Sequence, residues 1–243
     1  LTMSSTAHAS IRNLQVLHAD RLPDAGGMLL LPSRVSRHDL PRLAQLLMDR
    51  SVTYLVEHGQ PLPEGVRDHL DQTQSDVLAF APGPETLPGF RQTVQDLAAQ
   101  GRVLVHLPAA AAALNASVTT VPGATLEFLT QAGVPVLPLC VHHCAEVRLT
   151  IDPHLPEGSA VFAFGNPLPP SEATAAAVLE SLFLLAAETF ENNPALDLSL
   201  PYALIKGFKK HGSRGRVIDG KDDRVLGFDK VFAAAIALSR HIR

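Results

Sequence analysis

Short apolar runs alternate with segments of helical spacing over the first 190 residues, and this alternation most constrains the fold. Residues 28–31, 103–105 and 134–141 are almost continuously apolar, which predicts buried strands. Residues 39–49 and 90–100 repeat their apolar side chains at helical spacing. Strands and helices in this order predict an α/β fold, with a central, mostly parallel or mixed sheet flanked by helices.

Further segments extend the same alternation. Residues 11–18, 52–56, 77–80 and 161–164 are predicted strands, and residues 125–132 and 171–190 are predicted helices. Ser171 is the expected N-cap of the last of these helices.

The pattern changes near Asn192. An amphipathic helix is predicted over 200–211, then a hairpin that pairs 217–220 with 224–228, then a final helix over 229–243. We therefore expect one domain over residues 1–195 and the start of a second over 196–243. Because the chain begins with Leu and ends inside a predicted helix, we expect it to be part of a longer protein.

Composition narrows the class of protein. The 243 residues are 46% hydrophobic with a net charge of −4, which argues against a dedicated nucleic-acid binder. Two cysteines imply no disulfide framework and favour a reducing compartment, so a cytoplasmic location is expected. The most apolar helix, near residues 173–190, carries two glutamates and is too short to predict a membrane span.

The cluster Cys140, His142, His143 and Cys144 raises the question of a metal site. On a strand, residues 140 and 144 would lie roughly 13 Å apart, whereas two thiolates on one zinc must lie within about 4 Å. We therefore interpret the cluster as part of the core and predict no metal. The chain has neither a phosphate-binding loop nor a Gly-x-Ser-x-Gly motif, and no cofactor is expected.

Three segments in order resemble the motifs of glycerolipid acyltransferases. Residues 25–39 resemble the strand, Asn-His-x-Ser-x-x-Asp motif and helix that open the family's fold. Residues 100–108 are similar to the approach to its Phe-Pro-Glu-Gly motif, and residues 122–139 to its Gly-Ala helix and Val-Pro-Val-x-Pro strand. The resemblance covers about residues 11–190. It implies transfer of an acyl group to a lysophospholipid, with the motif His as general base and the Asp orienting it.

The chain departs from the first motif where its chemistry lies. Asp39 is present, but Arg34 stands at the position of the His and Ser33 at that of the Asn. Arginine remains protonated and cannot accept the proton of a hydroxyl group.

The second motif is changed as well. Pro108 is kept, whereas Ala109 replaces the Glu and Ala110 replaces the Gly. The resemblance implies substrate contacts at these residues, at Ser33 and Arg34, and at Gly123.

Three functions follow as alternatives. The substitutions favour a degenerate acyltransferase domain with little or no activity, retained as a scaffold or as a module that binds acyl chains or a carrier protein. An active enzyme would need a displaced base, for which His38 and His106 are the candidates. The third alternative is a structural spacer that no ligand enters.

The C-terminal segment is similar to the start of adenylate-forming acyl-activating enzymes, over residues 202–212, 217–220 and 226–231. The two resemblances together match the bifunctional acyl-(acyl carrier protein) synthetase / 2-acylglycerophosphoethanolamine acyltransferases. This arrangement implies acyl carrier protein or acyl-CoA as donor, a lysophospholipid as acceptor, the remaining synthetase domain as partner, and peripheral contact with the inner face of the cell membrane. No nucleic-acid partner is expected.

Overall fold

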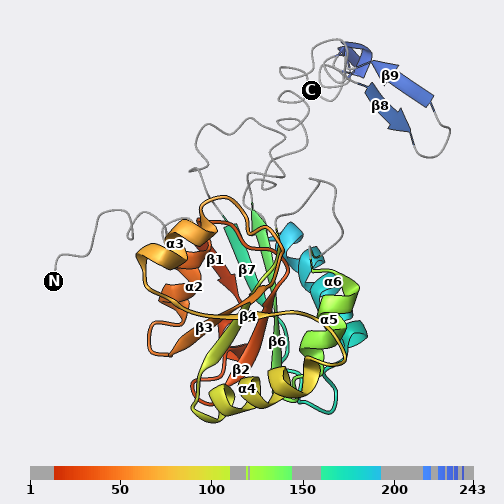
Figure 1. The fold of residues 1–243 in the computed structure, drawn as a ribbon. Helices are drawn as coiled ribbons and strands as arrows, with labels where there is room; N and C mark the ends of the chain where they lie inside the picture. Colours follow the sequence, from red (N-terminus) through yellow and green to blue (C-terminus); the bar gives the residue numbers. More distant parts are fainter. Residues whose placement is uncertain are drawn as a thin grey trace. The chain divides into compact units, whose positions relative to one another are not determined.

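The computed structural model describes residues 14–109, 119, 121–143, 160–192, 216–219, 224–227, 229–231, 233, 234 and 237. Seven strands form one sheet in the order β1-β7-β6-β2-β5-β3-β4 (Figure 1). Every neighbouring pair is parallel except β6 with β7. The strands are β1 (Leu14–Leu17), β2 (Met28–Pro32), β3 (Val52–Glu57), β4 (Asp76–Phe80), β5 (Val103–Leu107), β6 (Val136–His143) and β7 (Ala160–Phe164).

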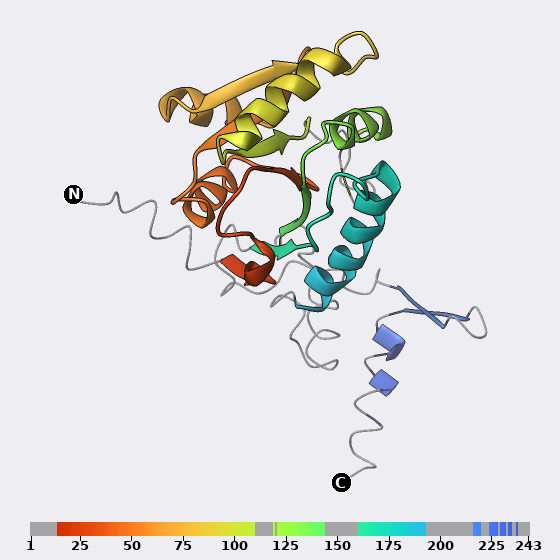
Figure 2. The same cartoon turned by 90° about the horizontal axis from the view of Figure 1, so that it is seen from below.

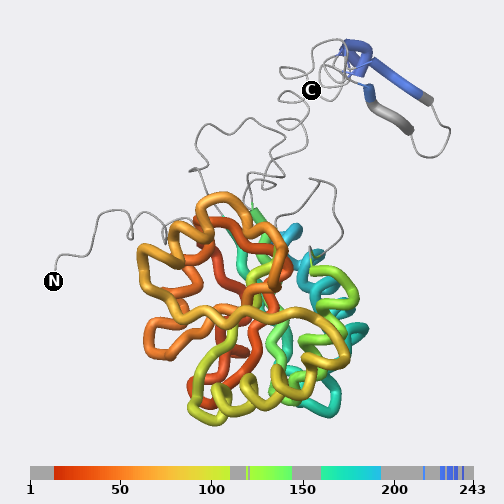
Figure 3. The backbone as a smooth tube through the Cα atoms, viewed as in Figure 1, coloured from red at the N-terminus to blue at the C-terminus, as the bar shows by residue number. Residues whose placement is uncertain are grey.

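The predicted α/β fold is confirmed, and so is the place of its most apolar runs. Strands β6, β2 and β5 are the three central strands of the sheet. In the backbone trace of Figure 3, β2 (red) runs through the middle of the part that contains this sheet, beside β6 (green). Helices cover both faces of these strands, so their side chains are buried on both sides and their sequences have no polar alternation.

In the described ranges, five α-helices cover the two faces of the sheet. On one face, α2 and α3 pack over a core that contains Leu30, Val105 and Leu139. On the other, α4, α5 and α6 pack over Leu29, Leu104 and Val136, and Figure 2 shows these three helices in succession along that side. Their bounds are α2 (Leu40–Leu46), α3 (Val66–Gln72), α4 (Leu87–Ala99), α5 (Gly123–Thr130) and α6 (Ala175–Glu191).

Two details of the helices differ from the sequence analysis. Helix α3 was not predicted, because only Val66 and Leu70 give its seven residues a buried side. Helix α6 begins later than expected, since the Oγ1 of Thr174, rather than Ser171, accepts the capping hydrogen bond from the N–H of Ala177 at 3.1 Å.

The chain enters β2 through a very close contact with the end of α4. A Cβ added at Gly27 would lie 2.1 Å from the carbonyl oxygen of Ala98 and 2.2 Å from its Cα. Both are backbone atoms, so the neighbour could give way only if the helix moved. A glycine at this position therefore sets the packing of α4 against the start of the central strand.

The predicted C-terminal hairpin is confirmed as β8 (Arg216–Asp219) paired antiparallel with β9 (Arg224–Gly227). It forms a separate two-stranded sheet and falls in the second of two compact units of the chain. Residues 229–231 are helical, as predicted for the last helix. The helix predicted over 200–211 lies outside the described residues.

Candidate functional site

The parallel strands of the sheet end at one edge, where the chain turns to opposite faces. After β2 it enters α2 on one face, whereas the helix between the neighbouring strand β5 and β6 is α5, on the other face. In open α/β sheets, ligands bind at the carboxyl ends of strands where the connections diverge in this way. Asp39, the retained acid of the first motif, lies directly before α2 at this edge.

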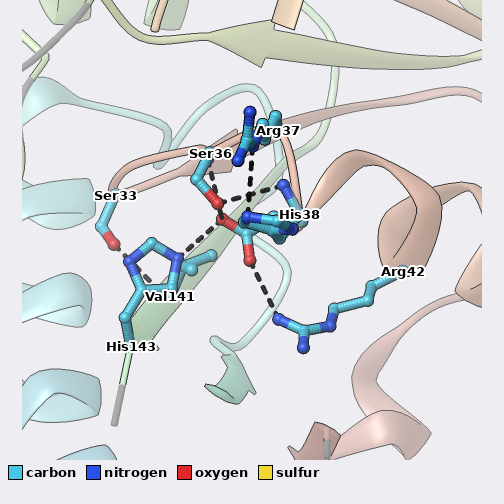
Figure 4. Close-up of polar contacts among 8 residues, drawn as sticks. Ser33, Ser36, Arg37, His38, Arg42, Val141 and His143 are labelled. Atoms are coloured by element: carbon cyan, nitrogen blue, oxygen red, sulfur yellow. Dashed lines mark hydrogen bonds and ion pairs between the residues drawn. The ribbon is translucent and has the colours of Figure 1, made fainter. Parts of the chain in front are cut away.

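Asp39 is fully buried and is held by three neighbouring side chains (Figure 4). Its Oδ2 accepts hydrogen bonds from the backbone N–H of Ser36 at 2.8 Å and from the Ser36 hydroxyl at 2.7 Å. The same oxygen lies 2.7 Å from the Nε2 of His143. The buried guanidinium of Arg42 lies 3.4 Å from Oδ1. The backbone N–H of Ser36, the hydroxyl of Ser36 and Nε2 of His143 therefore all converge on Oδ2.

These contacts keep Asp39 ionised. Burial alone would raise the pKa of its carboxyl group, but the hydrogen bond and positive charge of His143 and the two hydrogen bonds of Ser36 outweigh burial and lower the pKa. An ionised carboxylate can only accept hydrogen bonds, so the proton between the two side chains is on Nε2 of His143. When the ring is neutral, this placement of the proton makes Nδ1 the nitrogen that carries the lone pair.

His143 reaches Asp39 because of its register in β6. Side chains alternate between the faces of a strand, and Leu137, Leu139 and Val141 lie on the face that α2 covers. His143, the last residue of the strand, continues this series to the edge where Asp39 lies. Its side chain is 18% exposed, so solvent reaches the ring although the carboxylate behind it is buried.

The sequence analysis missed this pairing. From the separation of residues 140 and 144 alone, the whole cluster was assigned to the core. The residue that faces α2 is the odd-numbered His143. It is the last residue of β6, the strand that pairs with β2.

The two histidines proposed as displaced bases lie elsewhere. His38 is on the exposed turn before α2, and its Nε2 accepts a hydrogen bond from the Nε of Arg37 at 3.2 Å. His106 has the even register of β5 and packs 5.9 Å from Phe80, ring to ring, in the core on the opposite face of the sheet from α2. Among the described residues, those that contact the carboxylate of Asp39 are Ser36, Arg42 and His143.

Burial of His106 predicts a loss of stability in acid. Burial lowers the pKa of its ring to about 3, whereas the unfolded chain titrates near the ordinary value of 6.5. Between these values the unfolded state binds the extra proton, so stability falls as the pH falls, by up to about 1.4 kcal/mol per pH unit. When chemical denaturation is repeated at pH values from 7 down to 4, the free energy of unfolding of His106→Leu should rise steadily relative to that of the wild type. A stability difference that does not change with pH would contradict this assignment.

Ser33 and Arg34, at the positions of the motif Asn and His, do not join the carboxylate. Ser33 is fully buried, its Oγ accepts a hydrogen bond from the N–H of Val141 at 3.0 Å, and its carbonyl accepts one from Thr119 at 3.0 Å. Arg34 is half-buried, and its charge acts on the thiol of Cys140. Burial raises the pKa of that thiol, and hydrogen bonds from Thr189 and Ser33 and the charge of Arg34 offset part of the shift.

The residues of the second motif follow β5 at the same edge. Pro108 is buried and Ala109 is half-buried, whereas Ala110 lies outside the described residues. Gly123 is the exposed first residue of α5, and a Cβ added there would meet no atom within 4 Å. The predicted contacts of these residues with substrate remain predictions.

The cysteine and histidine cluster does not form a metal site in the part of the chain that the structure describes. Cys140 is buried in the core with its sulfur 3.7 Å from the hydroxyl of Thr189, and Cys144 lies outside the described residues. Groups of three or more metal-ligating side chains are absent from the described ranges. His142 turns toward α6, where its ring meets Phe190 edge-on at 6.5 Å.

Comparison with solved structures identifies the architecture. The structure matches that of the 1-acyl-sn-glycerophosphate (LPA) acyltransferase PlsC from Thermotoga maritima with a TM-score of 0.50. The match covers 80% of each chain at 13% sequence identity. The chain therefore shares the fold of this acyltransferase. The sequence matches no protein-family profile, and no curated protein matches it significantly.

The acyltransferase-like fold places Asp39 and His143 at the carboxyl edge of its central strands. No helix in the described ranges is long and apolar enough to cross a membrane.

Proposed function

We propose that this chain transfers an acyl group from a thioester to the hydroxyl of a lysophospholipid, with His143 as general base and Asp39 as its orienting carboxylate. The observation that carries the proposal is the 2.7 Å contact between Nε2 of His143 and Oδ2 of Asp39. A histidine backed by a buried carboxylate is the arrangement that proton transfer from a hydroxyl group requires.

The reaction follows from the tautomer of His143. Nδ1 takes the proton of the acceptor hydroxyl while its oxygen bonds to the thioester carbonyl carbon, and the ionised Asp39 stabilises the positive imidazolium. When the tetrahedral intermediate collapses, the carbon–sulfur bond breaks and the departing sulfur takes the proton back from Nδ1. The products are the acylated lipid and a free thiol, and the base is regenerated.

A displaced base explains how the site can tolerate Arg34. In the motif the base would follow β2, whereas here it comes from the neighbouring strand β6, and both strands end at the same edge. Asp39, which follows β2, orients the base that β6 supplies. The degenerate and spacer alternatives give no role to a buried, ionised Asp39 in contact with a histidine that solvent reaches.

The donor and the second domain complete the proposal. We assign acyl-CoA or acyl-(acyl carrier protein) as the donor, and residues 196–243 as the start of an adenylate-forming synthetase that would supply the thioester. The separate two-stranded sheet of β8 and β9 supports a second domain. We also assign peripheral contact with the inner face of the cell membrane, because a lysophospholipid acceptor resides in a membrane.

The assay pairs labelled acyl thioesters with a panel of lysophospholipids, and its variant is Asp39→Asn. This change keeps the shape of the side chain but removes its charge, and we expect transfer to fall by about 10²–10⁴-fold. Asp49→Asn, the same change at an exposed carboxylate, is the control and should retain full activity. A folded wild-type chain that transfers no acyl group from either donor would favour the non-catalytic alternatives instead.

A further inference from the structure

Arg42 is a buried cation to which the proposed reaction gives no role. It lies in the first turn of α2, and only 3% of its surface is exposed. Both features oppose a positive charge, because burial removes its hydration and the amino end of a helix favours negative charge. An arginine at this position therefore needs a compensating anion, and the carboxylate of Asp39 is in contact with it.

The carboxylate of Asp39 is shared between two basic side chains. Nη1 of Arg42 lies 3.4 Å from Oδ1, whereas Nε2 of His143 lies 2.7 Å from Oδ2. Figure 4 shows the two side chains reaching different oxygens of the carboxylate. The guanidinium is charged at every working pH, whereas the imidazole is charged only when it is protonated. One buried anion therefore faces a permanent cation and a ring whose charge can change.

Other charged and titratable side chains come from the end of β2, from the turn before α2 and from α3, which packs on the same face. They are Arg34, Arg37, His38, Arg67, Asp68 and His69. These six side chains, all in the described ranges, make no contact with the carboxylate of Asp39. Among the described side chains with a permanent charge, Arg42 is therefore the one that contacts it.

The charge of Arg42 makes protonation of His143 less favourable. A buried carboxylate stabilises an imidazolium beside it, and a second cation on the same carboxylate offsets part of that stabilisation. The ring is then neutral over a wider range of pH, and only a neutral ring can accept the proton of a hydroxyl group.

We propose that Arg42 is a positioning residue that acts through Asp39, and that its permanent charge keeps His143 neutral, and so able to act as a base, down to a lower pH. Its role in catalysis rests on the proposed function, whereas the effect of its charge on His143 is measured without turnover. An ion pair with a structural role alone would affect the stability of the fold but not the protonation of His143.

The test is the pH titration of the His143 ring by NMR in the full chain, with its signal identified by its loss in His143→Gln. Arg42→Gln removes the charge but keeps an N–H that can donate to Oδ1 of Asp39. We expect the midpoint of the titration to rise by about one pH unit in this variant. Arg42→Lys restores the charge and should restore the midpoint. The matched control is Arg67→Gln, the same change at an exposed arginine of α3, and it should leave the midpoint unchanged.

The pH profile of acyl transfer gives a second readout. The acid limb of kcat/KM should move to higher pH by the same amount in Arg42→Gln, which lowers the rate about tenfold at pH values well below the limb. Above the limb the rate should change much less.

An unchanged midpoint in folded Arg42→Gln, or an equal rise in Arg42→Lys or in the control, would overturn the proposal. If Arg42→Gln does not fold, the comparison is made between Asp39→Asn and Asp39→Asn/Arg42→Gln, since the double variant leaves neither buried charge without its partner. The midpoint should again be higher in the variant that lacks Arg42, and equal midpoints would contradict the proposal.

Failure of the proposed function gives a different result. A chain whose His143 midpoint rises on loss of Arg42, but which transfers no acyl group, would contradict the proposed function and leave the effect of Arg42 standing. A chain that needs His143 for acyl transfer, but whose midpoint does not respond to Arg42, would contradict only the role of Arg42.

Discussion

Replacing His143 with Gln is expected to lower acyl transfer by about 10²–10⁴-fold, the usual contribution of a general base. The amide N–H of glutamine can still donate to the carboxylate of Asp39, so the buried charge keeps a partner and the fold should survive. Glutamine cannot accept the proton of the acceptor hydroxyl. The loss should therefore appear in kcat, measured with saturating thioester and lysophospholipid, while the thermal stability stays near that of the wild type.

The control for this variant is its neighbour in the chain. His142→Gln makes the same change one residue earlier, on a side chain that turns toward Phe190 instead of Asp39. It should retain most of the activity. If both variants lose activity equally, or if His143→Gln is as active as the wild type, His143 is not the base.

Gly27→Ala should cause the largest loss of stability among single substitutions considered for this fold. The added Cβ would overlap the backbone of Ala98 at 2.1–2.5 Å, and backbone cannot move aside as a flexible side chain can. We expect the free energy of unfolding to fall by about 3 kcal/mol or more, at the upper end of the range for overpacking. Urea denaturation of the purified variant, or its failure to accumulate as folded protein, measures the effect.

Gly89→Ala provides the contrast. Gly89 lies inside α4, and a Cβ added there meets no atom within 4 Å. Alanine favours the helix by up to about 1 kcal/mol over glycine, so this variant should be as stable as the wild type or more stable. Tolerance of alanine at both positions would contradict the close contact at Gly27.

The sequence was sufficient to predict the sheet because its central strands are buried on both faces. The apolar runs that form β2, β5 and β6 show no alternation of polar and apolar residues, as expected of strands buried on both faces. Gly101 and Gly133, with φ of 79° and 74°, mark the ends of the helices before β5 and β6. By contrast, α3 has only two buried side chains, so its own sequence shows little helical periodicity of apolar residues.

The site could be predicted only in part, since its two principal residues are 104 positions apart. Asp39 was identified through the motif in which it stands. His143 could be found only from the register of β6 beside β2 and from which face α2 covers, and both are properties of the assembled sheet. His106 shows the same effect in reverse. Its position beside the second motif suggested a base, whereas its register buries it against Phe80.

A double-mutant cycle on Asp39 and His143 tests the central claim most directly. If the carboxylate acts only through the imidazole, Asp39→Asn and His143→Gln both impair the same general base. Once His143 is replaced, the substitution of Asp39 should have no further effect on catalysis. We predict that the kcat of the double variant equals that of His143→Gln alone. Losses that multiply in the double variant would show that the two residues act independently and would contradict a shared Asp39–His143 base.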